Sequence, residues 1–209
     1  MKLEIVFEDP DLILCSKPSG ILSEEGGMPQ LLRESCGAEE IYCVHRLDKA
    51  AGGLMVYART RQAAADLSRQ IREGCFEKRY LAVVCGAAEA RGSMRDLLYR
   101  DAAKNKSYVV RRTRRGVREA ELRYETLQRT PERSLVRIQL LTGRSHQIRV
   151  QFASRKLPLA GDGKYGSPER DCPLALWSES LRFLHPRSGE VMEYRISPPA
   201  VHPWTLFSI

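Results

Sequence analysis

A carboxylate flanked by basic side chains and followed by small residues stands out in segment 45–53, which reads His-Arg-Leu-Asp-Lys-Ala-Ala-Gly-Gly. Asp48 is the carboxylate, and Arg46 lies two residues before it. Glycine allows main-chain conformations that other residues avoid and lets a ligand approach closely, so this carboxylate could be poised for catalysis. The alternative is a structural salt bridge beside a turn. These residues alone leave both interpretations open.

A second polar segment, 143–147, reads Gly-Arg-Ser-His-Gln. Together with Asp48, its Ser145 and His146 could form the triad of a hydrolase. In the commonest hydrolase fold the nucleophile sits in Gly-x-Ser-x-Gly, and segment 143–147 ends in glutamine instead of the second glycine. The sequence therefore disfavours a serine hydrolase.

Six blocks, considered together, are much more specific than either segment alone. They have the order and composition of conserved blocks in the RluA family of pseudouridine synthases, which the chain resembles along almost its whole length. The blocks are 8–20 (Glu-Asp-Pro-Asp-Leu-Ile to Lys-Pro-Ser-Gly), 45–54 (His-Arg-Leu-Asp to Gly-Leu), 78–83 (Lys-Arg-Tyr-Leu-Ala-Val), 141–149 (Leu-Thr-Gly-Arg-Ser-His-Gln-Ile-Arg), 161–166 (Gly-Asp-Gly-Lys-Tyr-Gly) and 185–190 (His-Pro-Arg-Ser-Gly-Glu).

The resemblance implies a role for five residues. Asp48 matches the catalytic aspartate, and Arg144 matches the arginine whose guanidinium keeps that carboxylate ionised in a water-poor pocket. Tyr80 matches the tyrosine that stacks on the target base, and Ile148 the apolar residue that packs near the uracil. Arg46 matches the position that fills the gap left when the target nucleotide leaves its stack.

The reaction implied is the isomerisation of uridine to pseudouridine in structured ribosomal or transfer RNA. The carboxylate acts either as a nucleophile on the ribose or as a base at its 2′ carbon. No electrons or groups enter, so we expect no cofactor and no metal. The rival interpretation is a non-catalytic RNA-binding or chaperone protein on the same fold, from which we would expect Asp48 or Arg144 to have been lost.

The chain departs from the family pattern in two places. Where the family has Asp-Thr-Ser-Gly, this chain has Ala50-Ala51-Gly52-Gly53, so side-chain hydroxyls that could fix the loop are absent. The chain also begins directly with the catalytic blocks, and we expect it to lack the small N-terminal RNA-binding module of many relatives. RNA affinity would then come from a single catalytic domain spanning 1–209.

Positive charge is concentrated in segment 91–118. This segment has ten basic residues against two acidic ones and accounts for the whole net charge of +8. A concentrated positive field suits a polyanion, although a solvated surface loop would have the same composition. We predict that this segment binds RNA phosphates, chiefly through its densest part: Arg111, Arg112, Arg114 and Arg115.

Length and composition suit a globular protein of 209 residues. No apolar run approaches the roughly 20 residues that cross a bilayer, and we expect a cytoplasmic, single-domain monomer without a membrane partner. The six cysteines show no close pairing such as Cys-x-x-Cys, which disfavours both a disulfide scaffold and a structural metal.

Alternating and periodic segments predict an α+β protein with a mixed, mainly antiparallel sheet and a few packed helices. We expect strands at 3–8, 12–16, 53–58, 76–85, 119–127 and 134–141, and a terminal hairpin of 181–184 with 191–196. Helices are expected from Thr60, as N-cap, to about Arg72, with Gly74 as the C-terminal stop, and from His146 to about Lys156.

Overall fold

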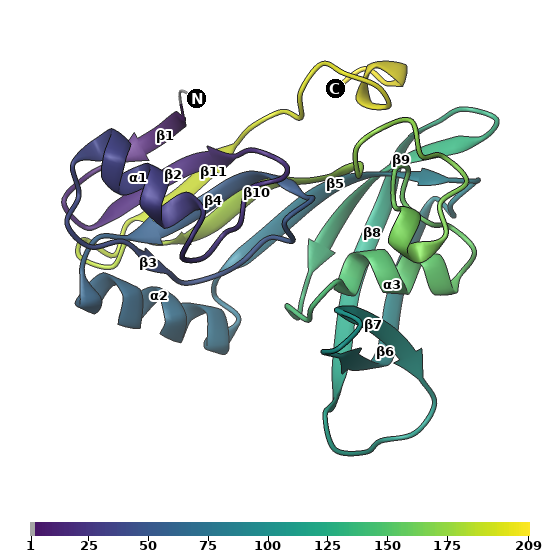
Figure 1. Ribbon diagram of the computed structural model, residues 1–209, viewed down its shortest axis with the longest axis horizontal. Helices are drawn as coiled ribbons and strands as arrows, with labels where there is room; N and C mark the ends of the chain where they lie inside the picture. The colour runs from purple at the N-terminus through teal and green to yellow at the C-terminus, as the bar shows by residue number, and fades with distance from the viewer. Residues whose placement is uncertain (1–2) are drawn as a thin grey trace. The chain divides into compact units, whose positions relative to one another are not determined.

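The computed structural model describes residues 3–209. The chain forms two compact units (Figure 1). The first extends to Lys78 and includes Trp177–Pro198, and the second comprises Arg79–Leu176 and Pro199–Ile209. Each unit is built on β-strands with its own packed helices.

The strands of the first unit pair in the order β1, β2, β4, β10 and β11. All these pairs are antiparallel except β4 with β10, which run parallel, and the short β3 also pairs with β4. Every residue of β4 is buried, as its continuous apolar composition predicts. The strands are β1 (Glu4–Glu8), β2 (Leu12–Lys17), β3 (Tyr42–Cys43), β4 (Gly52–Ala58), β10 (Leu176–Leu184) and β11 (Val191–Arg195).

Two helices complete the first unit, α1 (Met28–Cys36) and α2 (Arg61–Glu73). The hydroxyl of Thr60 accepts the N–H of Ala63 at 3.1 Å and caps the start of α2. Gly74, with φ of 77°, ends it in the left-handed conformation that glycine adopts readily. Thr60 and Gly74 were predicted as these boundaries, and both are confirmed.

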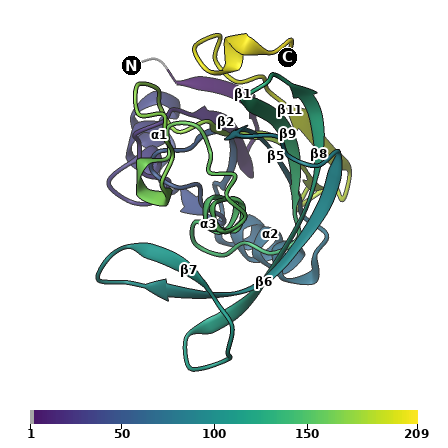
Figure 2. The ribbon, with the colours of Figure 1, turned by 90° about the vertical axis from the view of Figure 1, so that its right-hand side faces the viewer.

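The second unit contains five antiparallel strands in the order β5, β9, β8, β6 and β7. Helix α3 (Gln147–Ser154) lies within the curve of these strands (Figure 2) and buries six consecutive residues from its start. Because it is covered nearly all round, it has little amphipathic character. The strands are β5 (Glu77–Cys85), β6 (Arg91–Asp101), β7 (Lys106–Val110), β8 (Val117–Arg129) and β9 (Arg133–Leu140).

The α+β class and the mixed, mainly antiparallel pairing predicted from the sequence are confirmed. The predicted terminal hairpin is present as β10 and β11, and its turn contains Gly189 with φ of 72°. In residues 3–209, no helix combines the length and the apolar composition that a membrane crossing requires.

Candidate active site

Asp48 lies half-buried in a loop of the first unit just before β4. The Lys-Pro-Ser-Gly turn that follows β2 holds the main chain of this loop. The hydroxyl of Ser19 donates to the carbonyl of Ala50 at 2.6 Å, and the N–H of Gly20 donates to the carbonyl of Lys49 at 2.7 Å. Two of the blocks recognised in the sequence therefore form one structural feature.

Ser23 fixes the same loop on the other side of Asp48. Its buried hydroxyl donates to the carbonyl of Leu47 at 2.9 Å and accepts the N–H of Leu47 at 3.0 Å. The hydroxyls that the family pattern places after the aspartate are absent here. Ser19 and Ser23, which precede the aspartate in sequence, supply hydroxyls that bond the loop.

Close packing between strands explains why two glycines follow the loop. Gly53 has φ of 114°, and a Cβ there would lie 2.4 Å from the carbonyl oxygen of Ser178. A Cβ on Gly52 would lie 2.5 Å from the ring of Trp177. Because β4 and β10 approach closely where these residues pair, any side chain at either position would force the strands apart.

Lys17 is a buried cation beside the Asp48 loop. Its ammonium donates to the carbonyls of Pro18 and Ile21, both at 2.8 Å, and to that of Lys49 at 3.4 Å. Burial lowers the pKa of Lys17 to about 8, and the negative charge of Asp48 partly opposes this effect. Lys17 therefore ties the loop to the turn and places positive charge near Asp48. In the sequence Lys17 lies within the first of the six family blocks, but it was given no role.

Arg46 carries its guanidinium near the surface of the first unit, with 54% of its side chain exposed. It donates to a carboxylate oxygen of Glu24 at 2.8 Å. This bond raises the pKa of Arg46, and Asp48 adds a smaller contribution in the same direction. A guanidinium that is exposed and feels the charge of Asp48 suits the role predicted for Arg46, which stays a prediction.

His45 makes a main-chain contact within the protein interior. Its Nε2 accepts the N–H of Val56 at 3.2 Å, so the neutral ring carries its proton on Nδ1. Burial lowers the pKa of His45 to about 3, and the charge of Lys78 contributes in the same direction. The imidazole is therefore neutral at working pH, which agrees with a structural role and not with proton transfer.

We expect His45 to make the protein less stable in mild acid. Its folded pKa of about 3 lies below the ordinary value of 6.5, so its contribution is fully present above pH 6.5 and is lost as pH falls towards 3. At pH 5 the unfolded state gains about 2 kcal/mol from protonating this ring. Urea unfolding at pH 7.5 and pH 5 should show a smaller acid loss for His45→Gln, whose amide oxygen can still accept from Val56. An equal loss in both proteins would contradict this assignment.

Tyr80 and Ile148 belong to the second unit, and both are buried. Tyr80, on β5, has an exposed fraction of 5% and pairs across the sheet with Ile138 of β9. Ile148, in the first turn of α3, has an exposed fraction of 4%. Core residues would show similar burial, so the contacts with the target base predicted for these two side chains stay predictions.

Arg144 lies in a loop of the second unit that Gln147 organises. The side-chain oxygen of Gln147 accepts the hydroxyl of Thr142 at 2.8 Å and the N–H of Arg144 at 3.0 Å. Its side-chain nitrogen donates to the carbonyl of Glu121 at 3.0 Å. The guanidinium of Arg144 donates through Nε to the carbonyl of Glu119 at 2.8 Å, which fixes the side chain on β8. The pairing of Arg144 with Asp48 stays a prediction.

Tyr165 and Ser107 connect this loop to the start of β7, beside the turn of the β6–β7 hairpin. The hydroxyl of Tyr165 accepts the N–H of Ser107 at 2.8 Å and lies 2.9 Å from Nδ1 of His146. The hydroxyl of Ser107 donates to the carbonyl of Ser145 at 2.6 Å. His146 has φ of 53° and turns the chain into α3. The hairpin and the Arg144 loop are thus joined by partly buried hydrogen bonds.

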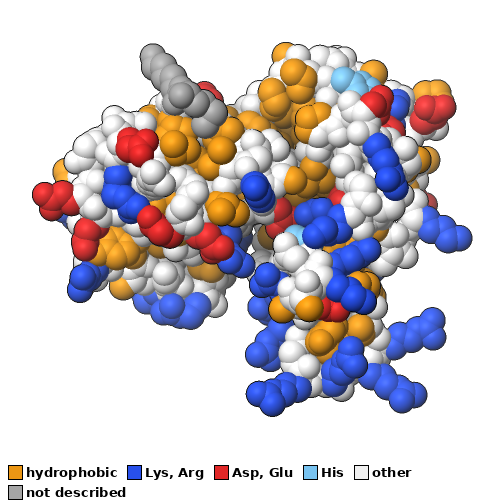
Figure 3. All heavy atoms as spheres, in the orientation of Figure 1, with side chains coloured by type: hydrophobic (Ala, Val, Ile, Leu, Met, Phe, Trp, Pro, Cys, Tyr) orange, Lys and Arg blue, Asp and Glu red, His pale blue; other side chains and the backbone are white. Residues whose placement is uncertain are grey.

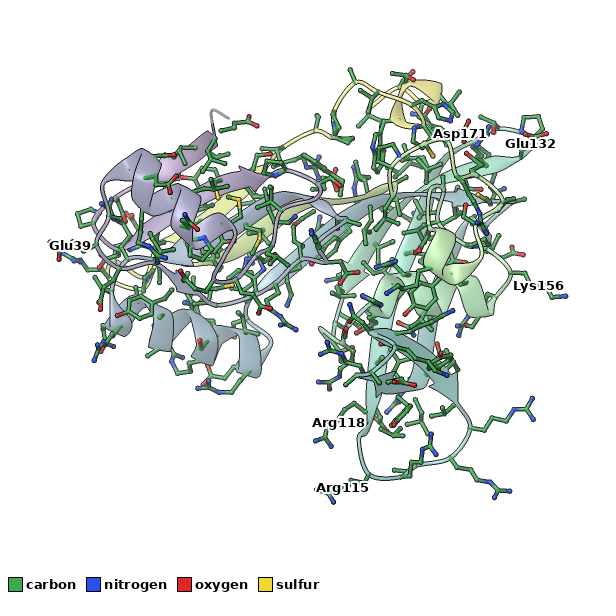
Figure 4. All side chains as sticks on the ribbon, viewed as in Figure 1. Glu39, Arg115, Arg118, Glu132, Lys156 and Asp171 are labelled. Carbon is green, nitrogen blue, oxygen red and sulfur yellow. The ribbon has the colours of Figure 1, made fainter. Side chains whose placement is uncertain are left out.

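Segment 111–116, here called the basic loop, connects β7 to β8 and is exposed throughout. Lys and Arg side chains gather on the hairpin and this loop (Figure 3), and Arg115 and Arg118 point outward from the ribbon (Figure 4). The guanidinium of Arg114 lies over the ring of Tyr99, 4.5 Å from its centroid. Gly116, with φ of 85°, turns the chain into β8. Exposure fits both a phosphate-binding loop and a solvated surface loop, so phosphate binding stays a prediction.

The fold is that of a pseudouridylate synthase domain. The structure of human RNA pseudouridylate synthase domain containing 4 matches with a TM-score of 0.79 at 24% identity, covering 94% of this chain and 88% of that one. Human RNA pseudouridylate synthase domain containing 1 matches with a TM-score of 0.81 at 22% identity, covering 96% and 85%. Residues 11–154 also match the family model described as RNA pseudouridylate synthase. The chain belongs to this family, as its six blocks predict.

Curated relatives from several bacteria agree with this assignment. The ribosomal large subunit pseudouridine synthase D of Nitrosomonas europaea is 33% identical over 91% of this chain. The ribosomal large subunit pseudouridine synthase C of Pasteurella multocida is 33% identical over 95%, and that of Escherichia coli 33% over 93%. The chain spans 60%, 65% and 66% of the lengths of these three relatives.

Proposed function

We propose that this chain converts uridine to pseudouridine in RNA and that Asp48 is its catalytic carboxylate. One observation carries the proposal: in a member of this family, the Asp48 loop is held by side-chain hydrogen bonds from Lys17, Ser19 and Ser23. A carboxylate that must meet one atom of a sugar needs such fixed positioning, because small displacements of reacting groups cost large factors in rate.

The chemistry is internally balanced. The bond between uracil N1 and ribose C1′ breaks, the uracil turns, and a bond forms between C5 and C1′. N1 gains a proton and C5 loses one, so no group or electron pair enters from outside. The carboxylate of Asp48 either attacks C1′ or removes the proton from C2′. Kinetics with RNA that carries deuterium at C2′ distinguish these two mechanisms, because only proton removal from C2′ gives a large primary isotope effect.

Arg144 is proposed to be the cation that keeps the carboxylate ionised. Arg144→Ala should then lower kcat more than it weakens RNA binding. Arg144→Lys should restore only part of kcat, because lysine keeps the charge and loses the planar, two-pronged guanidinium. Steady-state kinetics of the three proteins test this expectation. Equal kcat in Arg144→Ala and the unaltered protein would contradict the role.

We propose ribosomal RNA of the large subunit as the substrate class, because the curated relatives are named for it. The RNA would be held partly by the basic loop. The same proposal includes that the chain acts as one catalytic domain, is a monomer and is located in the cytoplasm.

Pseudouridine mapping of total RNA from cells with and without the gene tests this function. Loss of pseudouridine at a defined site in large-subunit ribosomal RNA, restored by the gene and not by its Asp48→Asn form, is the expected result. Loss of pseudouridine at a transfer RNA site would support the proposed activity and show that transfer RNA, not ribosomal RNA, is the substrate. An unchanged map, with RNA binding intact, would favour the non-catalytic RNA-binding protein.

A further inference from the structure

A group of potential metal ligands lies in the second unit, where a loop near Asp171 meets the C-terminal segment (Figure 4). Glu169 and Cys172 come from the loop and His202 from the segment. One ligand atom from each lies within 4.8 Å of the other two. Cys172 is buried, and His202 is exposed over 45% of its side chain, so a route from solvent exists.

Of the two carboxylate oxygens of Glu169, only Oε1 has hydrogen-bond partners among residues 3–209. Its Oε1 accepts the Nε–H of Arg133 at 2.8 Å and the thiol of Cys85 at 3.3 Å. Its Oε2 is buried and has no hydrogen-bond partner among residues 3–209. A buried carboxylate oxygen without a partner is costly, and in folded proteins such an atom calls for an explanation.

The distance from Oε2 of Glu169 to Nε2 of His202 suggests an explanation for the oxygen without a partner. Glu169 Oε2 and His202 Nε2 are 3.9 Å apart, which is too long for a hydrogen bond. Two such ligands on one tetrahedral zinc ion lie about 3.4 Å apart, given zinc–oxygen and zinc–nitrogen bonds of about 2.1 Å. An approach of the two atoms by about 0.5 Å would let both bind one ion.

We propose that Glu169, Cys172 and His202 bind a zinc ion. A thiolate, an imidazole and a carboxylate together suit zinc, whereas calcium and magnesium prefer oxygen ligands alone. A water molecule can take the fourth position, because Cys85 lies outside the group whose ligand atoms are within 4.8 Å of one another. Binding through the Cys172 thiolate releases one proton. The two positive charges of the zinc ion then balance the negative charges of the Glu169 carboxylate and the Cys172 thiolate.

A second cluster of potential metal ligands lies in the first unit, and its ligand atoms already bond to other protein groups. Asp9, Asp11 and His185 also bring their ligand atoms within 4.8 Å. There, His185 Nε2 lies 2.7 Å from a carboxylate oxygen of Asp9, and its Nδ1 accepts the N–H of Ser188 at 3.1 Å. Arg187 binds the carboxylate of Asp11 at 2.6 Å. Internal bonds occupy these atoms, so this cluster carries no proposal.

The proposed ion is structural: it would tie the segment Pro199–Ile209 to the loop that holds Cys172. It takes no part in the chemistry proposed for Asp48, so the two proposals fail separately. The proposal runs against the expectation from cysteine spacing, which disfavoured a structural metal. The ligands come from distant positions, and only Glu169 and Cys172 are close in sequence.

Metal binding to the full, untagged chain tests the site. After treatment with a chelator and its removal, titration with zinc should show one ion bound per chain, and zinc should raise the Tm. Cobalt should give the absorption of a cobalt–thiolate bond. Cys172→Ser and His202→Ala should each weaken zinc binding by more than the roughly 10- to 100-fold that loss of an outer partner costs. Cys75→Ser, at an exposed cysteine of the first unit, is the matched control and should change nothing.

Circular dichroism would show that each variant is folded. Absence of stoichiometric zinc binding would overturn the proposal, as would equal affinity in the unaltered protein and the two ligand variants. The metal-free protein should still form pseudouridine, since no step of that reaction uses a Lewis acid. If the metal-free protein is inactive until zinc is restored, with the RNA fold controlled, the ion is not purely structural and the proposal as stated fails.

Discussion

Asp48→Asn is expected to lower the rate of pseudouridine formation by roughly 10⁴-fold or more, the scale on which loss of a catalytic nucleophile acts. Asparagine keeps the size of the side chain and removes its charge and its ability to attack or to accept a proton. RNA affinity should change little. Single-turnover kinetics with saturating enzyme would separate the chemical step from binding.

The matched control for this variant is Asp66→Asn. Asp66 is also half-buried in the first unit, on α2, and its carboxylate accepts from Arg69 and Gln70 of the same helix. It should retain full activity. Comparable turnover by Asp48→Asn and the unaltered protein would show that another group carries out the reaction.

Replacement of the four arginines of the basic loop with glutamine should weaken RNA binding and flatten its dependence on salt. Each lost phosphate contact lowers the slope of log affinity against log salt by roughly 0.7 to 0.9. Four contacts at the lower value account for a slope of nearly 3, or roughly 50-fold in affinity between 50 and 200 mM salt. The free energy of unfolding should change little, since these residues are exposed. The four are Arg111, Arg112, Arg114 and Arg115.

The control variant loses the same number of positive charges at positions outside the basic loop. Four exposed arginines of the first unit, Arg61, Arg69, Arg72 and Arg182, are replaced with glutamine. This variant should keep most of the salt dependence if phosphate contacts are concentrated in the basic loop. Equal slopes in the two variants would mean that the loop has no special part in RNA binding. Binding measured at four or more salt concentrations gives both slopes.

Much of the fold followed from local patterns. The α2 boundaries were predictable because Thr60 and Gly74 supply start and stop signals that act within one helical turn. Strand β4 was predictable because its apolar run is short and bounded by glycine and charged residues. Helix α1 was missed because Gly27 precedes it, where a serine or threonine cap would have marked the start. A Cβ on Gly27 would lie 2.2 Å from the carbonyl of Leu22, so packing excludes a capping side chain there.

The site was only partly predictable. Asp48 was identified from its motif, and its loop geometry depends on contacts with Ser19 and Ser23, which lie more than 20 residues away in sequence. Lys17 was given no role, because a lysine is normally exposed and its burial depends on three carbonyls from two separate segments. The zinc ligands proposed here are spread over distant positions in the same way. Spacing rules detect neighbours in sequence, whereas these groups become neighbours only after folding.

The most direct measurement is tritium release from RNA labelled at C5 of uridine. Pseudouridine formation replaces the C5–H bond with a bond to ribose, so each turnover releases one tritium into water. The purified chain with unmodified large-subunit ribosomal RNA should release tritium in step with the pseudouridine found by nucleoside analysis, and Asp48→Asn should release none. No release by the folded, RNA-binding protein on ribosomal or transfer RNA, or equal release by Asp48→Asn, would contradict the account.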